Sequence, residues 1–323
     1  RTDIAENINF FSSDKCAYCC GNYVVICSVK DKAQHFFPAN PKYGEITCFG
    51  IDEKGDFILL AIAQKGEKNI ITVRVFNKTD LFSPNGFRDL REIKLSPDDL
   101  EFGDYFISLS VNLSSSTIIA YFGTKVSGIV VYYFDTKLSN SQTRILAGEK
   151  LTSKYNYKQF KINPFDPNYF AVIGEGAFAV FKFNGVDKLN KVEISQNTYT
   201  EFEKTVFNFV TFTWVTNTRL AIINYSSDVF ILDYHKKFDA PLKKVYKSTD
   251  LFESKAKAKS IFSKYNNIFI VKDDGYTLKL ENKNLEGKQI SYEKVVGPKF
   301  IQNMPRMEVH TVSVTNPAIG GYS

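Results

Sequence analysis

Three cysteines near the start of the sequence are its best candidates for metal chemistry. Cys16, Cys19 and Cys20 contain the C-x-x-C spacing that is found in zinc sites. A tetrahedral site needs a second pair of ligands, and the sequence shows no recognisable one, because only two other thiols are present. The alternative is that Cys16 alternates with Tyr18 and Cys20 along a β-strand and packs there. We therefore expect no metal ligands.

The sequence contains few residues that could carry out acid–base catalysis and no motif for binding a nucleotide. Its three histidines, His35, His235 and His310, are far apart, which leaves little from which to build nucleophile–base pairs. The sequence contains neither the phosphate-binding G-x-x-x-x-G-K-[ST] loop nor the G-x-S-x-G elbow. Gly174-Glu175-Gly176 fits a hairpin turn between two strands. We expect no catalytic residues, no cofactor and no enzyme activity.

Lysines concentrate between Lys236 and Lys264, including Lys243, Lys244, Lys255, Lys257 and Lys259. Such a run can face nucleic acid or an acidic protein tail, or it can be a solvated loop between two repeats. Acidic residues dilute the run, and the interleaved aromatic residues of RNA-binding motifs are missing. The net charge of +6, from 41 Lys and Arg against 35 Asp and Glu, is spread thinly along the chain. We expect no nucleic-acid partner.

The composition favours strands and a sizeable core. Hydrophobic residues make up 44% of the 323 residues and aromatic residues 15%, and such side chains suit a pleated, half-buried surface. The longest apolar runs, at 57–63 and 129–134, are much shorter than the roughly 20 residues of a membrane-spanning helix. Five cysteines, an odd number, fit a reducing compartment better than a disulfide framework. We expect an intracellular protein with no membrane partner.

A unit of about fifty residues recurs along the chain. Each copy has three short apolar strands separated by polar turns, and most copies are followed by a fourth, more polar strand. The turn residues that we take as equivalent are Asp52, Asn112, Asn163, Thr216, Lys264 and Asn316. Further turns are predicted at Ser127-Gly128, Gly174-Glu175-Gly176, Ser227-Asp228 and Asp274-Gly275. The polar fourth strands are expected at 91–95, 143–146, 191–194, 242–246 and 289–292.

Recurring four-stranded units without a helical period predict an all-β fold, a WD40-like β-propeller that has seven blades when complete. The predicted blades of this single domain are 1–44 (partial), 45–96, 104–147, 156–195, 206–247, 256–295 and 307–323 (partial). In the first we expect three strands, at 15–20, 23–29 and 34–37, and in the last a strand at 308–315. The chain is expected to end within that last blade, and the native polypeptide to continue beyond Ser323.

Four segments together resemble the N-terminal propeller of the cilia- and flagella-associated WD-repeat proteins. These segments are RTDIAENINFF from Arg1, CGNYVVICSVKDKAQHFFP from Cys20, INPFDPNYFAVIGEGAFAVFKF from Ile162 and FTWVTNTRLAIINYSSDVFILD from Phe212. The Gly-His and Trp-Asp pairs of ordinary WD repeats are absent, and only Phe134-Asp135 and Leu232-Asp233 keep the aspartate. The sequence also departs from the family's pattern at 18–21, where a proline or serine usually precedes the glycine, and at Asn224-Tyr225, where a Gly-Thr-Asp turn is common.

The resemblance implies a long protein with a second propeller and a coiled-coil tail in the axoneme of a cilium or flagellum. Its role there would be a non-catalytic scaffold that positions inner-arm dyneins and regulatory complexes on doublet microtubules for motility. The expected partners are therefore axonemal proteins, and the expected location is the cytoskeleton of the cytoplasm and cilium. Two alternatives stay open, since a fold does not fix a function: a general adaptor in a trafficking or ubiquitin assembly, and an enzyme with a site in the central channel.

Overall fold

The computed structural model describes eighteen segments of the chain, which form two compact units. The described residues are 8–12, 14–28, 30–65, 70–78, 90–94, 106–112, 116–122, 127–133, 144–151, 153–155, 157–195, 207–234, 238, 242–251, 257–264, 267–274, 277–281 and 292–295. The first unit is Arg1–Lys154 with Phe183–Leu189 and Ala318–Ser323, and the second is Tyr155–Lys182 with Asn190–Pro317. Each unit is described by itself.

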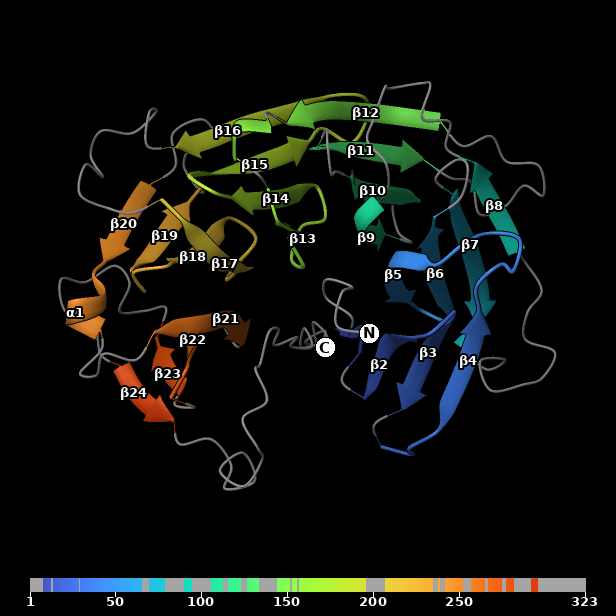
Figure 1. Cartoon of the computed structure of the whole chain (residues 1–323), viewed down its shortest axis with the longest axis horizontal. Helices are drawn as coiled ribbons and strands as arrows, with labels where there is room; N and C mark the ends of the chain where they lie inside the picture. Colours follow the sequence, from blue (N-terminus) through green and yellow to red (C-terminus); the bar gives the residue numbers. More distant parts are fainter. Residues whose placement is uncertain are drawn as a thin grey trace, which may run out of the picture. The chain divides into compact units, whose positions relative to one another are not determined.

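The first unit contains three four-stranded antiparallel sheets, in which strands that follow one another in sequence are neighbours (Figure 1). The first sheet consists of β1 (Ile8–Phe10), β2 (Lys15–Cys20), β3 (Tyr23–Ser28) and β4 (Gln34–Pro38). The second consists of β5 (Ile46–Lys54), β6 (Phe57–Gln64), β7 (Ile70–Asn77) and β8 (Leu90–Lys94). The third consists of β9 (Phe106–Asn112), β10 (Thr117–Phe122), β11 (Ser127–Tyr133) and β12 (Arg144–Leu151).

The second unit repeats the same meander three times. Its first sheet consists of β13 (Gln159–Ile162), β14 (Tyr169–Gly174), β15 (Ala177–Phe183) and β16 (Leu189–Ser195). The next consists of β17 (Phe209–Trp214), β18 (Arg219–Asn224), β19 (Val229–Asp233) and β20 (Leu242–Tyr246). The last consists of β21 (Ala258–Lys264), β22 (Asn267–Lys272), β23 (Thr277–Leu280) and β24 (Tyr292–Val295). A short helix, α1 (Ser248–Leu251), lies between β20 and β21. Among the described residues, no helix is long and apolar enough to cross a membrane.

The middle strand β6 is apolar on both faces because its sheet packs against the two other sheets of the first unit. In β6, Leu59, Ala61 and Ala63 join a cluster with the third sheet. The alternating residues Ile58, Leu60 and Ile62 join a second cluster with the first sheet. Full burial of one such large aliphatic side chain contributes about 1.5–3 kcal/mol. This two-sided packing explains the unbroken apolar run at 57–63, in which no polar residue alternates.

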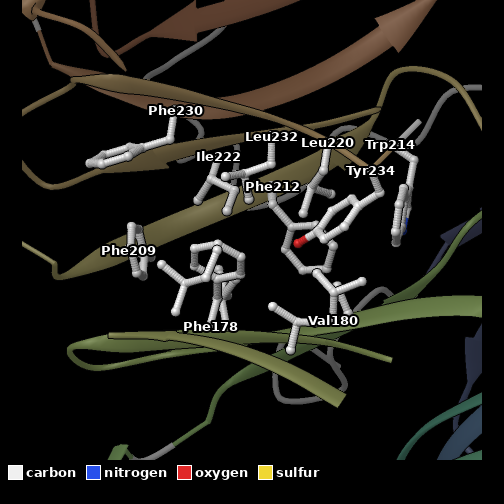
Figure 2. Packing of buried hydrophobic residues seen from close by; sticks show 14 of the residues in the cluster. Phe178, Val180, Phe209, Phe212, Trp214, Leu220, Ile222, Phe230, Leu232 and Tyr234 are labelled. Atoms are coloured by element: carbon white, nitrogen blue, oxygen red, sulfur yellow. The ribbon is translucent and has the colours of Figure 1, made fainter. Parts of the chain in front are cut away.

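An aromatic-rich core joins the first two sheets of the second unit (Figure 2). Phe178 and Val180 of β15 point toward Phe209 and Phe212 of β17 and the side chains beyond them. The buried Trp214 donates its indole N–H to the carbonyl of Lys161, at 3.4 Å, so the polar atom of this large side chain is satisfied. The packing and this hydrogen bond hold neighbouring sheets together from sequence positions about fifty residues apart.

The expected strands of the first sheet are present, but the structure adds a fourth. Strands β2, β3 and β4 lie where the sequence predicted them, whereas β1 was not predicted. Its three residues are too few to show an alternating pattern, and their place is fixed by pairing with β2, where Ile8 lies opposite Tyr18. The first sheet is therefore four-stranded, and the expectation of three strands was wrong.

Two predicted turns fall inside strands, and two further residues predicted as turns, Asn112 and Lys264, are the last residues of β9 and β21. Gly128 pairs with Phe122 in the β10–β11 ladder, so Ser127-Gly128 begins β11 and is no turn. Asp52 pairs with Leu59, and the β5–β6 turn comes later, at Gly55 and Asp56. Gly55 has a φ of 57°, a left-handed conformation that glycine adopts without strain.

The predicted fourth strands can be compared one by one with the structure. The strands predicted at 91–95, 143–146, 191–194 and 242–246 overlap β8, β12, β16 and β20. The last polar strand is β24 at Tyr292–Val295, which overlaps the predicted 289–292 only at Tyr292. The predicted strand at 308–315 and the residues Asn316, Gly275, Phe134 and Asp135 lie outside the described residues.

Candidate protein-interaction face

The strand geometry separates the cysteines of the C-x-x-C spacing. Successive side chains of a strand point to opposite faces, so Cys16 and Cys20 share one face of β2 and Cys19 lies on the other. Cys19 is buried in the core, and this burial raises the pKa of its thiol to about 12. Within the described segments, no three His, Cys, Asp or Glu side chains gather in a way that could hold a metal ion. Cys16 and Cys19 therefore cannot act as one chelating pair.

The one histidine within the described residues packs against an aromatic ring. His35 of β4 lies 4.5 Å from the Phe37 ring, measured between ring centroids. Burial lowers the pKa of the His35 imidazole, so it is neutral at pH 7. This contact is that of a packed side chain. His235 and His310 lie outside the described residues.

The lysine-rich stretch is distributed over different elements. Lys243 and Lys244 belong to β20 of one sheet, whereas Lys257 and Lys259 lie at the start of the next. Lys257 and Lys259 are exposed and flank the buried Ala258. Lys236 and Lys255 lie outside the described residues. The described part of this stretch therefore spans two sheets and does not follow a single strand.

In each sheet, the turn between the second and third strands lies at the same end as the connection to the next sheet, because the strands form a meander. The first such turn of the second unit is held by the segment that precedes β13. The backbone N–H of Glu175 donates to the carbonyl of Tyr155 at 2.6 Å, and that of Lys158 donates to Ile173 at 2.8 Å. A Cβ on Gly174 would lie 2.2 Å from the Tyr155 oxygen, so only glycine allows this close approach.

The connection before β17 joins two neighbouring turns. Phe207 accepts a hydrogen bond from the backbone N–H of Gly176 at 3.1 Å, and Asn208 accepts one from Tyr225 at 2.8 Å. Glu175 and Asn208 also form an isolated antiparallel bridge. The segment between the two sheets is thereby tied to the β14–β15 turn on one side and to the β18–β19 turn on the other.

A buried carboxylate ties the β18–β19 turn to the next connection. Asp228, 5% exposed, accepts hydrogen bonds from the backbone N–H of Ser248 at 2.9 Å and from the side-chain amide of Asn224 at 3.3 Å. The ammonium of Lys247 lies 3.5 Å from the same carboxylate. Next to it, Ser227 accepts a hydrogen bond from the N–H of Ala258 at 2.8 Å. The buried charge is thus compensated by several donors, as burial requires.

Two further sets of hydrogen bonds join a turn between the second and third strands of a sheet to the connection that enters or leaves that sheet. In the last sheet, Asp273 donates its N–H to the carbonyl of Lys257 at 2.9 Å and accepts the N–H of Lys257 on its side chain at 3.0 Å. In the first unit, the buried amide of Gln64 donates to the carbonyls of Asn40 and Gly44, both at 3.0 Å. Turn-to-connection hydrogen bonds are therefore a recurring device of this fold.

We call the exposed end of the second unit the turn face, and define it as residues 158, 175–176, 225–228, 247–249, 257 and 273–274. Tyr225 stands out on it, with 60% of its surface exposed beside the buried pair Ser227 and Asp228. The same face also carries the exposed charged side chains of Lys158, Glu175, Lys257, Asp273 and Asp274. Tyr225 is thus an exposed aromatic side chain on a backbone held by hydrogen bonds, and Tyr is one of the residue types enriched in protein interfaces.

Comparisons with known proteins define the fold. No protein-family model matches the chain, and no curated protein matches its sequence. Solved structures do match. The β-propeller domain of Cps50 (Swd1) from Myceliophteria thermophila aligns over 92% of this chain and 87% of its own, at 11% identity and a TM-score of 0.52. Hsv2 from Kluyveromyces lactis covers 88% and 84%, at 13% identity and 0.51. The WD40 propeller domain of Doa1 covers 90% and 82%, at 14% identity and 0.50.

The chain therefore has the all-β fold of a WD40-like β-propeller, and its four-stranded sheets are blades. Identities of this size show the fold alone. The number of blades in the complete ring stays a prediction.

The turn face was only partly visible in the sequence. Gly174-Glu175-Gly176 and Ser227-Asp228 were predicted as turns, and both lie on this face. Asp228 was not recognised as a buried acceptor, because its partner Ser248 is 20 residues away and has no motif of its own. One feature of the sequence could have identified Tyr225 as a candidate binding residue. It lies between turn residues, where a large aromatic side chain is unusual.

Proposed function

We propose that the protein is a non-catalytic docking scaffold whose turn face binds other proteins. The observation that carries the proposal is the exposed Tyr225 on a turn that is tied to its neighbours by backbone hydrogen bonds. An aromatic side chain with few rotatable bonds on a fixed backbone loses little conformational entropy on binding, which favours its use as an anchor. The WD40-like fold supports a scaffold or adaptor role in general, since its loops can engage partners while the sheets stay rigid.

We propose further that these partners are proteins of the ciliary or flagellar axoneme. What supports this setting is the resemblance of four segments to the N-terminal propeller of the cilia- and flagella-associated WD-repeat proteins, among which the segments are most similar to cilia- and flagella-associated protein fifty-seven. In that role the protein lies along doublet microtubules in the ciliary cytoskeleton and helps to position inner-arm dyneins and regulatory complexes for motility.

The binding test uses the purified chain and salt-extracted axonemes in co-sedimentation. The wild-type chain is expected to sediment with the axonemes, and Tyr225→Ala to weaken this binding at least about tenfold, which corresponds to 1.4 kcal/mol. Val186→Ala is the control, because Val186 is an apolar residue that is 66% exposed in the β15–β16 turn and is not part of the turn face. Equal binding by wild type and Tyr225→Ala would remove the turn face from the contact.

A cellular test addresses the setting separately. A tagged full-length protein in a ciliated cell is expected to stay with the axoneme after detergent extraction, and its deletion to reduce the inner-arm dyneins. A protein that is wholly extracted, in cells with normal motility, would contradict the axonemal setting. That result would favour the alternative function, an adaptor in a trafficking or ubiquitin assembly.

A further inference from the structure

Two thiols face each other on the first blade. Cys16 of β2 and Cys27 of β3 are directly opposite partners in the antiparallel ladder. Because they are directly opposed, their side chains point to the same face of the sheet, where opposed Cβ atoms lie about 4.5–5.5 Å apart. Each cysteine is partly exposed, and neither forms a disulfide in the structure. Neither residue is therefore closed off from a small oxidant as a core side chain would be.

The strand register already provides the geometry of a disulfide. Directly opposed residues in an antiparallel pair have Cα atoms about 4.5–5.5 Å apart. Disulfides need about 4.4–6.8 Å, so Cys16 and Cys27 can be joined without moving the strands. A hairpin with a glycine turn holds this register: Gly21, with a φ of 60°, lies between Cys20 and Tyr23, which pair with each other.

The other cysteines of the chain lack this arrangement. Cys20 shares the face of Cys16 and is exposed, but it lies opposite Tyr23. Cys19 and Cys48 are buried, at 4% and 2% exposure, and burial raises the pKa of both thiols, which keeps them protonated. Among the five cysteines, Cys16 and Cys27 are directly opposed in the ladder, and both are open to solvent.

We propose that Cys16 and Cys27 form a reversible oxidation site, which a hydroperoxide converts into a cross-strand disulfide. The Cys27 thiol releases its proton to solvent and its thiolate attacks one peroxide oxygen; the O–O bond breaks, the leaving alkoxide or hydroxide takes up a proton from solvent to become alcohol or water, and Cys27 becomes a sulfenic acid. The Cys16 sulfur then attacks the Cys27 sulfur, an S–S bond forms, and the hydroxyl leaves as water with the Cys16 proton. The peroxide is reduced by the two electrons that the two thiols lose.

Assignment of Cys16 as the second thiol follows from its surroundings. Burial, and to a smaller extent the neighbouring Cys27, raise the pKa of the Cys16 thiol, so this thiol stays protonated. It therefore reacts second, with the sulfenic acid formed on Cys27. A thiol reductant reverses the reaction through ordinary thiol–disulfide exchange. Under oxidising conditions, the bond fastens the two central strands of the first blade together.

Peptide mapping of the full chain tests the proposal directly. The chain is treated with hydrogen peroxide, unfolded in denaturant and blocked there with iodoacetamide, and digested with trypsin and chymotrypsin. Cleavage after Lys15, Tyr18, Tyr23 and Lys30 gives the peptides CAY, CCGNY and VVICSVK. We expect a linked CAY–VVICSVK pair that dithiothreitol separates, with both thiols of CCGNY alkylated in the early phase of the reaction. The melting temperature of the oxidised chain is expected to rise by about 5 °C.

Two variants complete the test. Cys16→Ser should abolish the linked pair and the rise in melting temperature, while the reduced protein melts within about 1 °C of wild type. Cys20→Ser should leave both unchanged. The proposal is overturned if Cys27 is still alkylated at a peroxide dose that modifies Cys20, or if the disulfide found contains Cys20 or joins two chains. An unlinked Cys27 sulfenic or sulfinic acid in the wild type would equally contradict a resolving role for Cys16.

Discussion

The carboxylate of Asp228 accepts a hydrogen bond from the backbone N–H of Ser248 at 2.9 Å, although the two residues are 20 positions apart. Asp228 closes the β18–β19 turn, and Ser248 begins the helix that leads toward the next blade. The bond therefore links a turn within one blade to the connection between two blades. The predictions below concern this tie and the packing around it.

Replacement of Asp228 by alanine should destabilise the chain by about 2–3 kcal/mol. The buried donors of Asn224 and Ser248 would lose their acceptor, and an unsatisfied buried donor costs about 1–3 kcal/mol. Asp228→Asn retains one acceptor oxygen and should cost less. Urea unfolding of the three proteins checks the order. Asp187→Ala, at an exposed turn position, is the control and is expected to stay within about 0.5 kcal/mol of wild type.

Gly174→Ala should cost more than Gly185→Ala. The new Cβ at position 174 would lie 2.2 Å from the backbone oxygen of Tyr155, which cannot move without breaking its hydrogen bond to Glu175. We expect a loss of about 3 kcal/mol or more. Gly185 has open space around it, and its φ of 85° alone disfavours alanine, by about 1 kcal/mol. Equal costs in denaturant unfolding would mean that the contact with Tyr155 relaxes freely.

Tyr234→Phe should leave the stability unchanged or raise it by up to about 1 kcal/mol. The Tyr234 ring is buried in the aromatic core of the second unit, and its hydroxyl has no hydrogen-bond partner among the described residues (Figure 2). Removing the oxygen abolishes a desolvation cost and keeps the ring packing. Differential scanning calorimetry at pH 7 measures the effect. A clear drop in melting temperature would show that the hydroxyl has a partner.

The same residue should influence stability at high pH. Burial raises the pKa of the Tyr234 hydroxyl well above its ordinary value of 10.0. Above pH 10 the unfolded chain loses this proton while the folded chain keeps it, so the free energy of unfolding falls as the pH rises, by about 1.4 kcal/mol per pH unit for one group. Tyr234→Phe should therefore flatten the alkaline decline between pH 10 and 11.5 in urea titrations. Parallel curves for the two proteins would contradict this.

Local sequence patterns were sufficient for the strands but not for several turns and one edge strand. The apolar runs of β6, β14 and β18 are unbroken, and their strand-like length between turn residues marks them as strands buried on both faces. Ser127-Gly128 was misplaced because the same residue types form turns or begin strands, and only the pairing with β10 distinguishes the two. Strand β1 was not predicted because its three residues are too few to show an alternation of apolar and polar side chains.

By itself, the sequence determined the repeat of about fifty residues, the four-stranded unit and the all-β class, because these depend on the spacing of apolar residues along the chain. Tertiary structure alone decided that Asp228 meets Ser248, that Gly174 lies against Tyr155, and that Cys16 faces Cys27 while Cys19 points the other way. Such contacts depend on strand register and on the packing of one blade against the next. No local pattern encodes them, since the free energy that fixes them comes from burial shared by residues far apart in sequence.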